Sequence, residues 1–132
     1  MVTLSGAFYY YNAFLTIFEF IPLANYYLLH KSPSQVATWL STDNDEVRSL
    51  HIAFLWFLIV ARAGVFFTKG KNSAIAWNCF AVHVSEIFLL GQSFRSSRSG
   101  ISLEMKLVFA VVLVNPVMYW YLATRGSGNK KK

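Results

Sequence analysis

The chain has 132 residues, of which 55% are hydrophobic, 17% aromatic and only 14% charged. Soluble globular domains contain about a quarter charged residues, and disordered chains are poor in apolar side chains, so this composition favours an integral membrane protein. Twelve Lys and Arg residues against six Asp and Glu residues give a formal charge of +6. Because Cys79 is the only cysteine, an internal disulfide and a four-cysteine zinc site are excluded.

Four apolar stretches follow one another along the chain, and each is long enough to cross a bilayer as a helix. About 20 apolar residues span a hydrocarbon core of about 30 Å, whereas strands rarely exceed about ten residues. We therefore predict an all-α integral membrane bundle of four transmembrane helices, forming a single domain over 1–132. The predicted helices cover about 4–29, 49–67, 73–92 and 107–123, and a basic tail covers 124–132.

The first stretch contains Glu19 and Pro22 within its apolar sequence. Because proline lacks a backbone N–H, we expect this helix to tilt or to bend at Pro22. The stretch has no basic start and is too long for the apolar core of an ordinary signal peptide, so it is interpreted as a retained helix.

A short turn, Thr68–Asn72, joins the second stretch to the third. So short a connection predicts that these two helices are antiparallel neighbours. The other two connections, 30–48 and 93–106, are longer and polar. The first holds an acidic run at 43–46, and the second is rich in serine and arginine.

Several polar residues fall inside the predicted spans at a similar depth: Glu19, His83, Glu86 and Asn115. An acidic side chain at the bilayer centre costs about 2.5–3.5 kcal/mol on insertion scales, so each needs a reason. One interpretation is a hydrogen-bonded cluster that holds the helices together. The other is a proton or ion path. We favour the structural interpretation, because a path needs polar residues that continue to both faces.

Arg62 is predicted to lie nearer the opposite interface, roughly level with Asn78. At about 1.5 Å per residue its depth does not match that of Glu86. We therefore expect Arg62 to reach lipid headgroups, or to bond to Asn78 or to a backbone carbonyl. Arg95 and Arg98 are likewise predicted to contact anionic headgroups at the membrane surface.

No constellation in the chain predicts catalysis. His83 and Glu86 have the i, i+3 spacing seen in di-iron bundles, but such sites need a second pair and two further carboxylates. Cys79 lies in an apolar helix, where a thiol stays protonated and inert. We predict no catalytic, cofactor-binding or metal-binding residue, no cofactor and no nucleic-acid partner.

The middle of the chain resembles the ergosterol biosynthetic protein 28 family. The resemblance rests on Arg48 and Ser49 before the second stretch, Arg62 late within it, a short polar turn, and the segment HVSEIF from His83 onwards. It covers about Arg48–Gln92. The resemblance implies a small four-helix membrane protein with a basic C-terminal tail, acting as a non-catalytic scaffold of the endoplasmic reticulum that tethers sterol-synthesis enzymes.

From the residues themselves we predict a non-catalytic multi-pass membrane scaffold, an accessory subunit of a larger assembly such as a mitochondrial inner-membrane respiratory or ATP synthase complex. The aromatic helix faces, such as Phe14 and Phe18, favour partners that are other integral membrane proteins and phospholipids. One alternative is an endoplasmic reticulum tether for sterol-synthesis enzymes. Another is a small proton-coupled channel or transporter that uses Glu19, His83 and Glu86.

Overall fold

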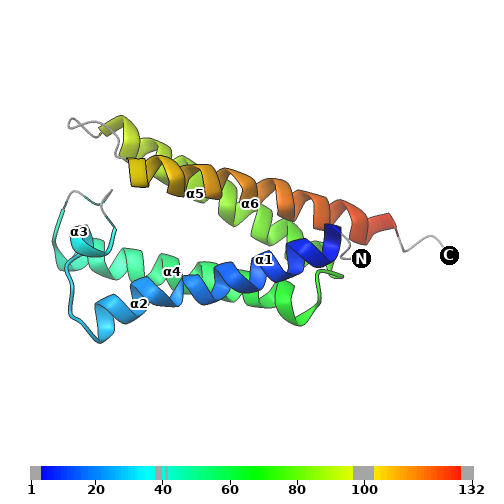
Figure 1. Ribbon diagram of the computed structural model, residues 1–132, viewed down its shortest axis with the longest axis horizontal. Helices are drawn as coiled ribbons and strands as arrows, with labels where there is room; N and C mark the ends of the chain where they lie inside the picture. The colour runs from blue at the N-terminus through cyan, green and yellow to red at the C-terminus, as the bar shows by residue number, and fades with distance from the viewer. Residues whose placement is uncertain (1–3, 38–39, 41, 97–102, 129–132) are drawn as a thin grey trace.

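The computed structural model describes residues 4–37, 40, 42–96 and 103–128, which form helices joined by turns and short connections, with no strands (Figure 1). The all-α prediction is therefore confirmed for this part of the chain. The helices in order are α1 (Leu4–Phe18), α2 (Phe20–Tyr27), α3 (Pro33–Val36), α4 (Asp45–Phe67), α5 (Ser73–Ser96) and α6 (Leu103–Gly128).

Three segments are long and apolar enough to cross a membrane: Asp45–Phe67, Ser73–Gln92 and Met105–Arg125, which lie in α4, α5 and α6. They fit a multi-pass membrane protein. The predicted first crossing is not found as one long helix. It is divided into α1, with 15 residues, and α2, with 8 residues, each shorter than a bilayer requires.

The division between α1 and α2 falls at Glu19, one turn before the proline at which the sequence predicts a bend. Pro22 has no N–H to donate to the carbonyl of Phe18, so the helical hydrogen-bond ladder is interrupted there. The Glu19 N–H still donates to the Leu15 carbonyl at 3.1 Å. Glu19 keeps helical dihedral angles, with φ −67° and ψ −17°, so α2 continues the course of α1 (Figure 1).

The long helices extend beyond their predicted ends. Asn44 caps α4, because its side chain accepts a hydrogen bond from the Val47 N–H at 2.8 Å. Asp45 and Glu46 then occupy the first turn, where the helix dipole favours acidic side chains. The acidic run that the sequence placed in a loop thus begins a helix. Similarly, α6 starts before 107 and continues to Gly128, so the predicted tail is helical over its first residues.

The turn between α4 and α5 reverses the chain in few residues. Lys69 and Gly70 both have positive φ angles, 51° and 67°, and the Gly70 N–H donates to the Val65 carbonyl at 2.9 Å. This is a typical helix C-terminus, in which left-handed residues satisfy the last carbonyls. The two helices leave the turn antiparallel, as predicted (Figure 1).

The bundle consists of an α5–α6 pair and an α1–α4 pair, joined by packing between α4 and α5 (Figure 1). One apolar core lies between α4, α5 and α6, and includes Leu58, Val65 and Met118. A smaller core, Leu23, Tyr26, Leu55 and Ile59, fastens α2 to α4. On α4, Arg62 lies between Ala61 and Val65 of the first core.

Candidate functional site

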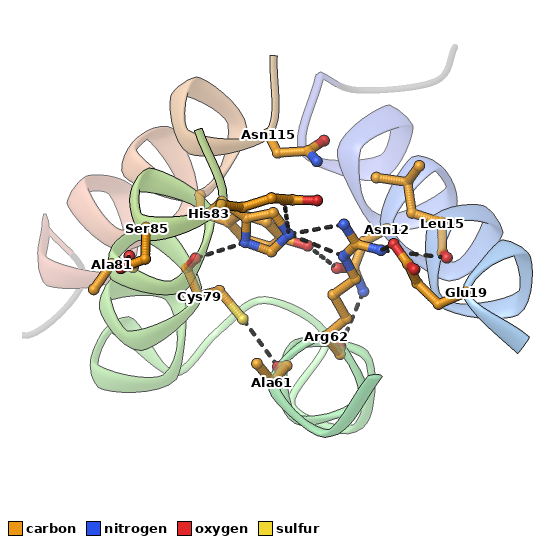
Figure 2. Close-up of polar contacts among 12 residues, drawn as sticks. Asn12, Leu15, Glu19, Ala61, Arg62, Cys79, Ala81, His83, Ser85 and Asn115 are labelled. Atoms are coloured by element: carbon orange, nitrogen blue, oxygen red, sulfur yellow. Dashed lines mark hydrogen bonds and ion pairs between the residues drawn. The ribbon is translucent and has the colours of Figure 1, made fainter. Parts of the chain in front are cut away.

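The polar residues inside the bundle meet around Arg62 of α4, whose side chain is almost completely buried (Figure 2). One terminal guanidinium nitrogen donates to Oε1 of Glu19 at 2.6 Å. The same nitrogen lies 3.4 Å from the Leu15 carbonyl oxygen. The Nε atom and the other terminal nitrogen donate to Nε2 of His83 at 3.0 and 2.8 Å. Arg62 therefore joins α1, α4 and α5.

The headgroup contact predicted for Arg62 is wrong, because this residue is 1% exposed and points into the bundle. Asn78, the second predicted partner, is exposed on α5. The third alternative, a backbone carbonyl, is found in the contact with Leu15. The depth of Arg62, counted along its helix, is compared above with that of Glu86 only, and not with that of the acid on the first helix. Glu19 comes within reach because α1 packs along α4, which the sequence alone does not place.

His83 has a defined hydrogen-bonding state in this arrangement. Its Nε2 atom faces the Arg62 donors and so must be the acceptor. Its Nδ1 atom lies 2.7 Å from the Cys79 carbonyl oxygen and must therefore carry the proton. His83 is thus a neutral imidazole with the proton on Nδ1, and its ring centre lies 4.6 Å from that of Tyr119.

Glu86 borders the same cluster without a hydrogen bond of its own to it. Its Oε2 lies 3.9 Å from His83 Nε2 and is buried without a hydrogen-bond partner among the described residues. The donors of Arg62 are directed to Glu19 and His83 instead. The positive charge of Arg62 is therefore neutralised by Glu19. Glu86 is a second acidic residue, which is not needed to neutralise that charge.

A second set of hydrogen bonds joins α1 to α4 and α6. The Tyr119 hydroxyl donates to the side-chain oxygen of Asn12, and the Asn12 amide donates to the Arg62 carbonyl at 3.1 Å. The Tyr11 hydroxyl donates to Asn115 at 3.1 Å. Asn115 thus lies beside the cluster but bonds to Tyr11 rather than to Glu19, His83 or Glu86.

Asn12 and Tyr119 are not among the residues predicted from the sequence to have a role, although both are fully buried. The position of Asn12 in the sequence does indicate a buried polar contact. An amide inside an apolar stretch needs a partner, and Asn12 precedes Glu19 by seven residues, which places both on one helix face. Tyr119 carried no comparable signal, because interfacial tyrosines are common near the ends of membrane helices.

Of the two arginines predicted to lie at the membrane surface, the structure describes one. Arg95 is exposed near the end of α5, just beyond the apolar segment. Arg98 lies outside the described residues. At the opposite end of the bundle, Arg125 lies over the ring of Tyr121, with 4.8 Å between the guanidinium carbon and the ring centre.

The described residues contain no group of three His, Cys, Asp or Glu side chains placed to hold a metal ion. The Cys79 thiol donates to the Ala61 carbonyl at 2.9 Å and is fully buried. The hydrogen bonds of Arg62 and of the Cys79 thiol therefore connect neighbouring helices.

Outside the spans, Asp43 forms a local contact with the start of α3. Its carboxylate accepts hydrogen bonds from the backbone N–H and the hydroxyl of Ser34, both at 2.7 Å. The hydrogen bond from the Ser34 side chain, followed by that from its backbone, lowers the pKa of the Asp43 carboxyl. This contact joins Asp43, which lies shortly before α4, to α3.

Comparisons of the chain with protein-family models, with curated proteins and with solved structures give no match. The resemblance to the ergosterol biosynthetic protein 28 family stays a prediction that rests on the residues quoted for it.

Proposed function

We propose that the chain is a non-catalytic multi-pass membrane scaffold, an accessory subunit of a larger membrane-protein assembly. In this proposal α1 and α2 together make a fourth crossing beside α4. Twenty-four residues, Leu4–Tyr27, reach roughly 36 Å at 1.5 Å per residue, enough for a hydrocarbon core.

The observation that carries the proposal is that the intramembrane polar side chains bond chiefly to one another. Arg62, Glu19 and His83 join α1, α4 and α5, and the hydrogen bond from Tyr119 to Asn12 adds α6. Interhelical hydrogen bonds fix the arrangement of membrane helices. Side chains that bond to one another in this way hold the helices of the bundle together. A scaffold requires such a fixed arrangement of helices.

The outer surface supports a role in assembly. Large apolar side chains cover the outward faces of the helices, and exposed examples are Tyr10, Phe14, Ile17, Phe57, Val60, Phe67, Phe88 and Val117. An open apolar groove of about 530 Å³, lined by Ala7 and Phe8 of α1 and Ala110 and Val111 of α6, adds a recess to this surface. Such faces can pack against partner helices within a bilayer.

The proposal is tested by capturing an endogenously tagged copy in mild detergent and identifying the proteins that co-migrate with it on a native gel. We expect a stable complex with integral membrane proteins. Respiratory or ATP synthase subunits would place the scaffold in the mitochondrial inner membrane, and sterol-synthesis enzymes would place it in the endoplasmic reticulum.

Two variants with matched substitutions are compared in the capture experiment. Phe14→Ala removes an outward aromatic ring that is 61% exposed, and it should weaken a complex that docks on α1 without harming the fold. Phe67→Ala removes a more exposed ring, at 80%, at the end of α4 and serves as the control for docking on α1. A chain that is recovered alone from every mild detergent would contradict the proposal.

A second candidate function, a proton-coupled channel or transporter, is favoured by one observation. Glu86 has a buried carboxylate oxygen with no partner among the described residues, next to His83. Acid and imidazole groups at one depth are the usual parts of a proton path. Flux through reconstituted protein that is abolished by Glu86→Gln would support it, whereas no flux, or flux unchanged by that substitution, would remove it.

A further inference from the structure

An open groove of about 330 Å³ lies on the outside of the α5–α6 pair. Its volume is at the lower end of the range for small-molecule sites, about 300–1,000 Å³. It is lined by Ile87, Phe88, Gly91, Gln92, Arg95 and Phe109. The α5 members recur at helical spacing and so form one stripe along the helix, with Phe109 of α6 facing them.

Gly91 gives this groove its depth. A Cβ atom built on Gly91 would meet none of the described side chains within 4 Å. Gly64 of α4 is different, because its Cβ would lie 3.1 Å from the Ile75 side chain on α5. Within the part of the chain that the structure describes, the space at the Gly91 Cβ position is therefore open.

The groove is apolar along its length and cationic at one end. The apolar segment of α5 that is long enough to span a membrane ends at Gln92, and Arg95 follows about 4.5 Å further along the axis, where headgroups would lie. Lys106 is exposed one turn before Phe109 on α6, at the same end. Among the described residues neither cation has an acidic partner.

We propose that this groove binds one anionic phospholipid. An acyl chain lies along Ile87, Phe88 and Phe109 over Gly91, and the phosphate is held by Arg95 and Lys106. A lipid suits this groove because its acyl chain can lie against the apolar lining while its charged phosphate meets the cations at one end. The larger groove between α1 and α6 has no charged lining residue, and so nothing in it selects a headgroup.

The test is native mass spectrometry of the full-length protein with equal amounts of phosphatidylglycerol and phosphatidylcholine that carry identical acyl chains. The wild type should retain phosphatidylglycerol about 25-fold over phosphatidylcholine, the preference expected of two well-placed cations that contribute about fivefold each. Arg95→Gln should lower that preference to about fivefold, because Lys106 remains. Lys71→Gln, which removes a cation at the opposite end of the bundle, should leave it unchanged.

Gly91→Leu tests the groove itself. Leucine is a better helix former than glycine, so the variant should fold and should lose the retained lipid because its side chain fills the space. Ala81→Leu, at an exposed position on the same helix outside the groove, should retain it. Equal retention of both lipids by the wild type, retention by Gly91→Leu, or equal loss in both leucine variants would overturn the proposal. None of these outcomes bears on capture of partner proteins.

Discussion

At the scale of single residues, the interior of the bundle is organised by one arginine and the groups that accept its hydrogen bonds. Arg62 is buried with an acid at 2.6 Å and an imidazole at 2.8 Å. Removing one member of a buried ion pair leaves the other charge uncompensated, which costs more than the pair contributes. Glu19 and Glu86 should therefore respond differently to the same substitution.

Glu19→Gln should lower the free energy of unfolding by about 3 kcal/mol, because it leaves the Arg62 charge buried without a counter-charge. Glu86→Gln is the matched control and should change it by less than about 1 kcal/mol, because Oε2 of Glu86 accepts no hydrogen bond from the described residues. Reversible unfolding in mixed micelles measures both. A larger loss for Glu86→Gln than for Glu19→Gln would show that Arg62 is paired with the other acid.

His83 should carry its proton on Nδ1, because Arg62 donates to Nε2 and the Cys79 carbonyl faces Nδ1. Nitrogen-15 NMR of selectively labelled histidine distinguishes the two tautomers. His83→Phe provides the assignment by removing one signal. A proton on Nε2, or on both nitrogens, at neutral pH would contradict the hydrogen bonds described around Arg62.

At the scale of helices, the first apolar segment is the element on which sequence and structure differ most. Its composition indicates one span, but Pro22 removes the donor that the Phe18 carbonyl needs, and the segment divides into α1 and α2. Our proposal of a fourth crossing requires α2 to continue α1 across the bilayer.

Tags at the two ends of the chain test that crossing. Four spans put both termini on one side of the membrane, whereas three spans put them on opposite sides. Protease digestion of sealed vesicles should therefore remove an N-terminal and a C-terminal tag together or spare both. Removal of only one tag would show that α1 and α2 do not cross. Detergent-opened vesicles, in which both tags are accessible, provide the control.

The contact between Asp43 and α3 should depend on pH. Its hydrogen bonds from Ser34 lower the pKa of Asp43 in the folded chain, so the contact is present above the ordinary pKa of 3.8 and is lost as pH falls through the lower folded value. The chemical shift of the Ser34 amide should report this transition. Asp43→Asn should remove the pH dependence. A Ser34 amide that titrates identically in both proteins would contradict the contact.

At the scale of the whole molecule, composition and span length predicted a helical membrane protein, because apolar stretches of bilayer length have few other folds available. Residue types within the spans identified Glu19, His83 and Glu86 as interior groups, since each is costly in lipid. The partner of Arg62 was not predictable in this way, because it depends on which helix packs beside α4 and at what height. The groove over Gly91 could not be predicted from the sequence either, since it depends on how α5 packs against α6.

The central claim, that this chain acts by holding helices and partners together rather than by moving protons, is tested most directly by complementation. Cells that lack the chain should lose the assembly recovered with it, and Glu86→Gln should restore that assembly and its activity to the wild-type level, because Glu86 holds no helix in place. Restored assembly without restored activity would contradict the claim, because Glu86 would then be performing proton chemistry.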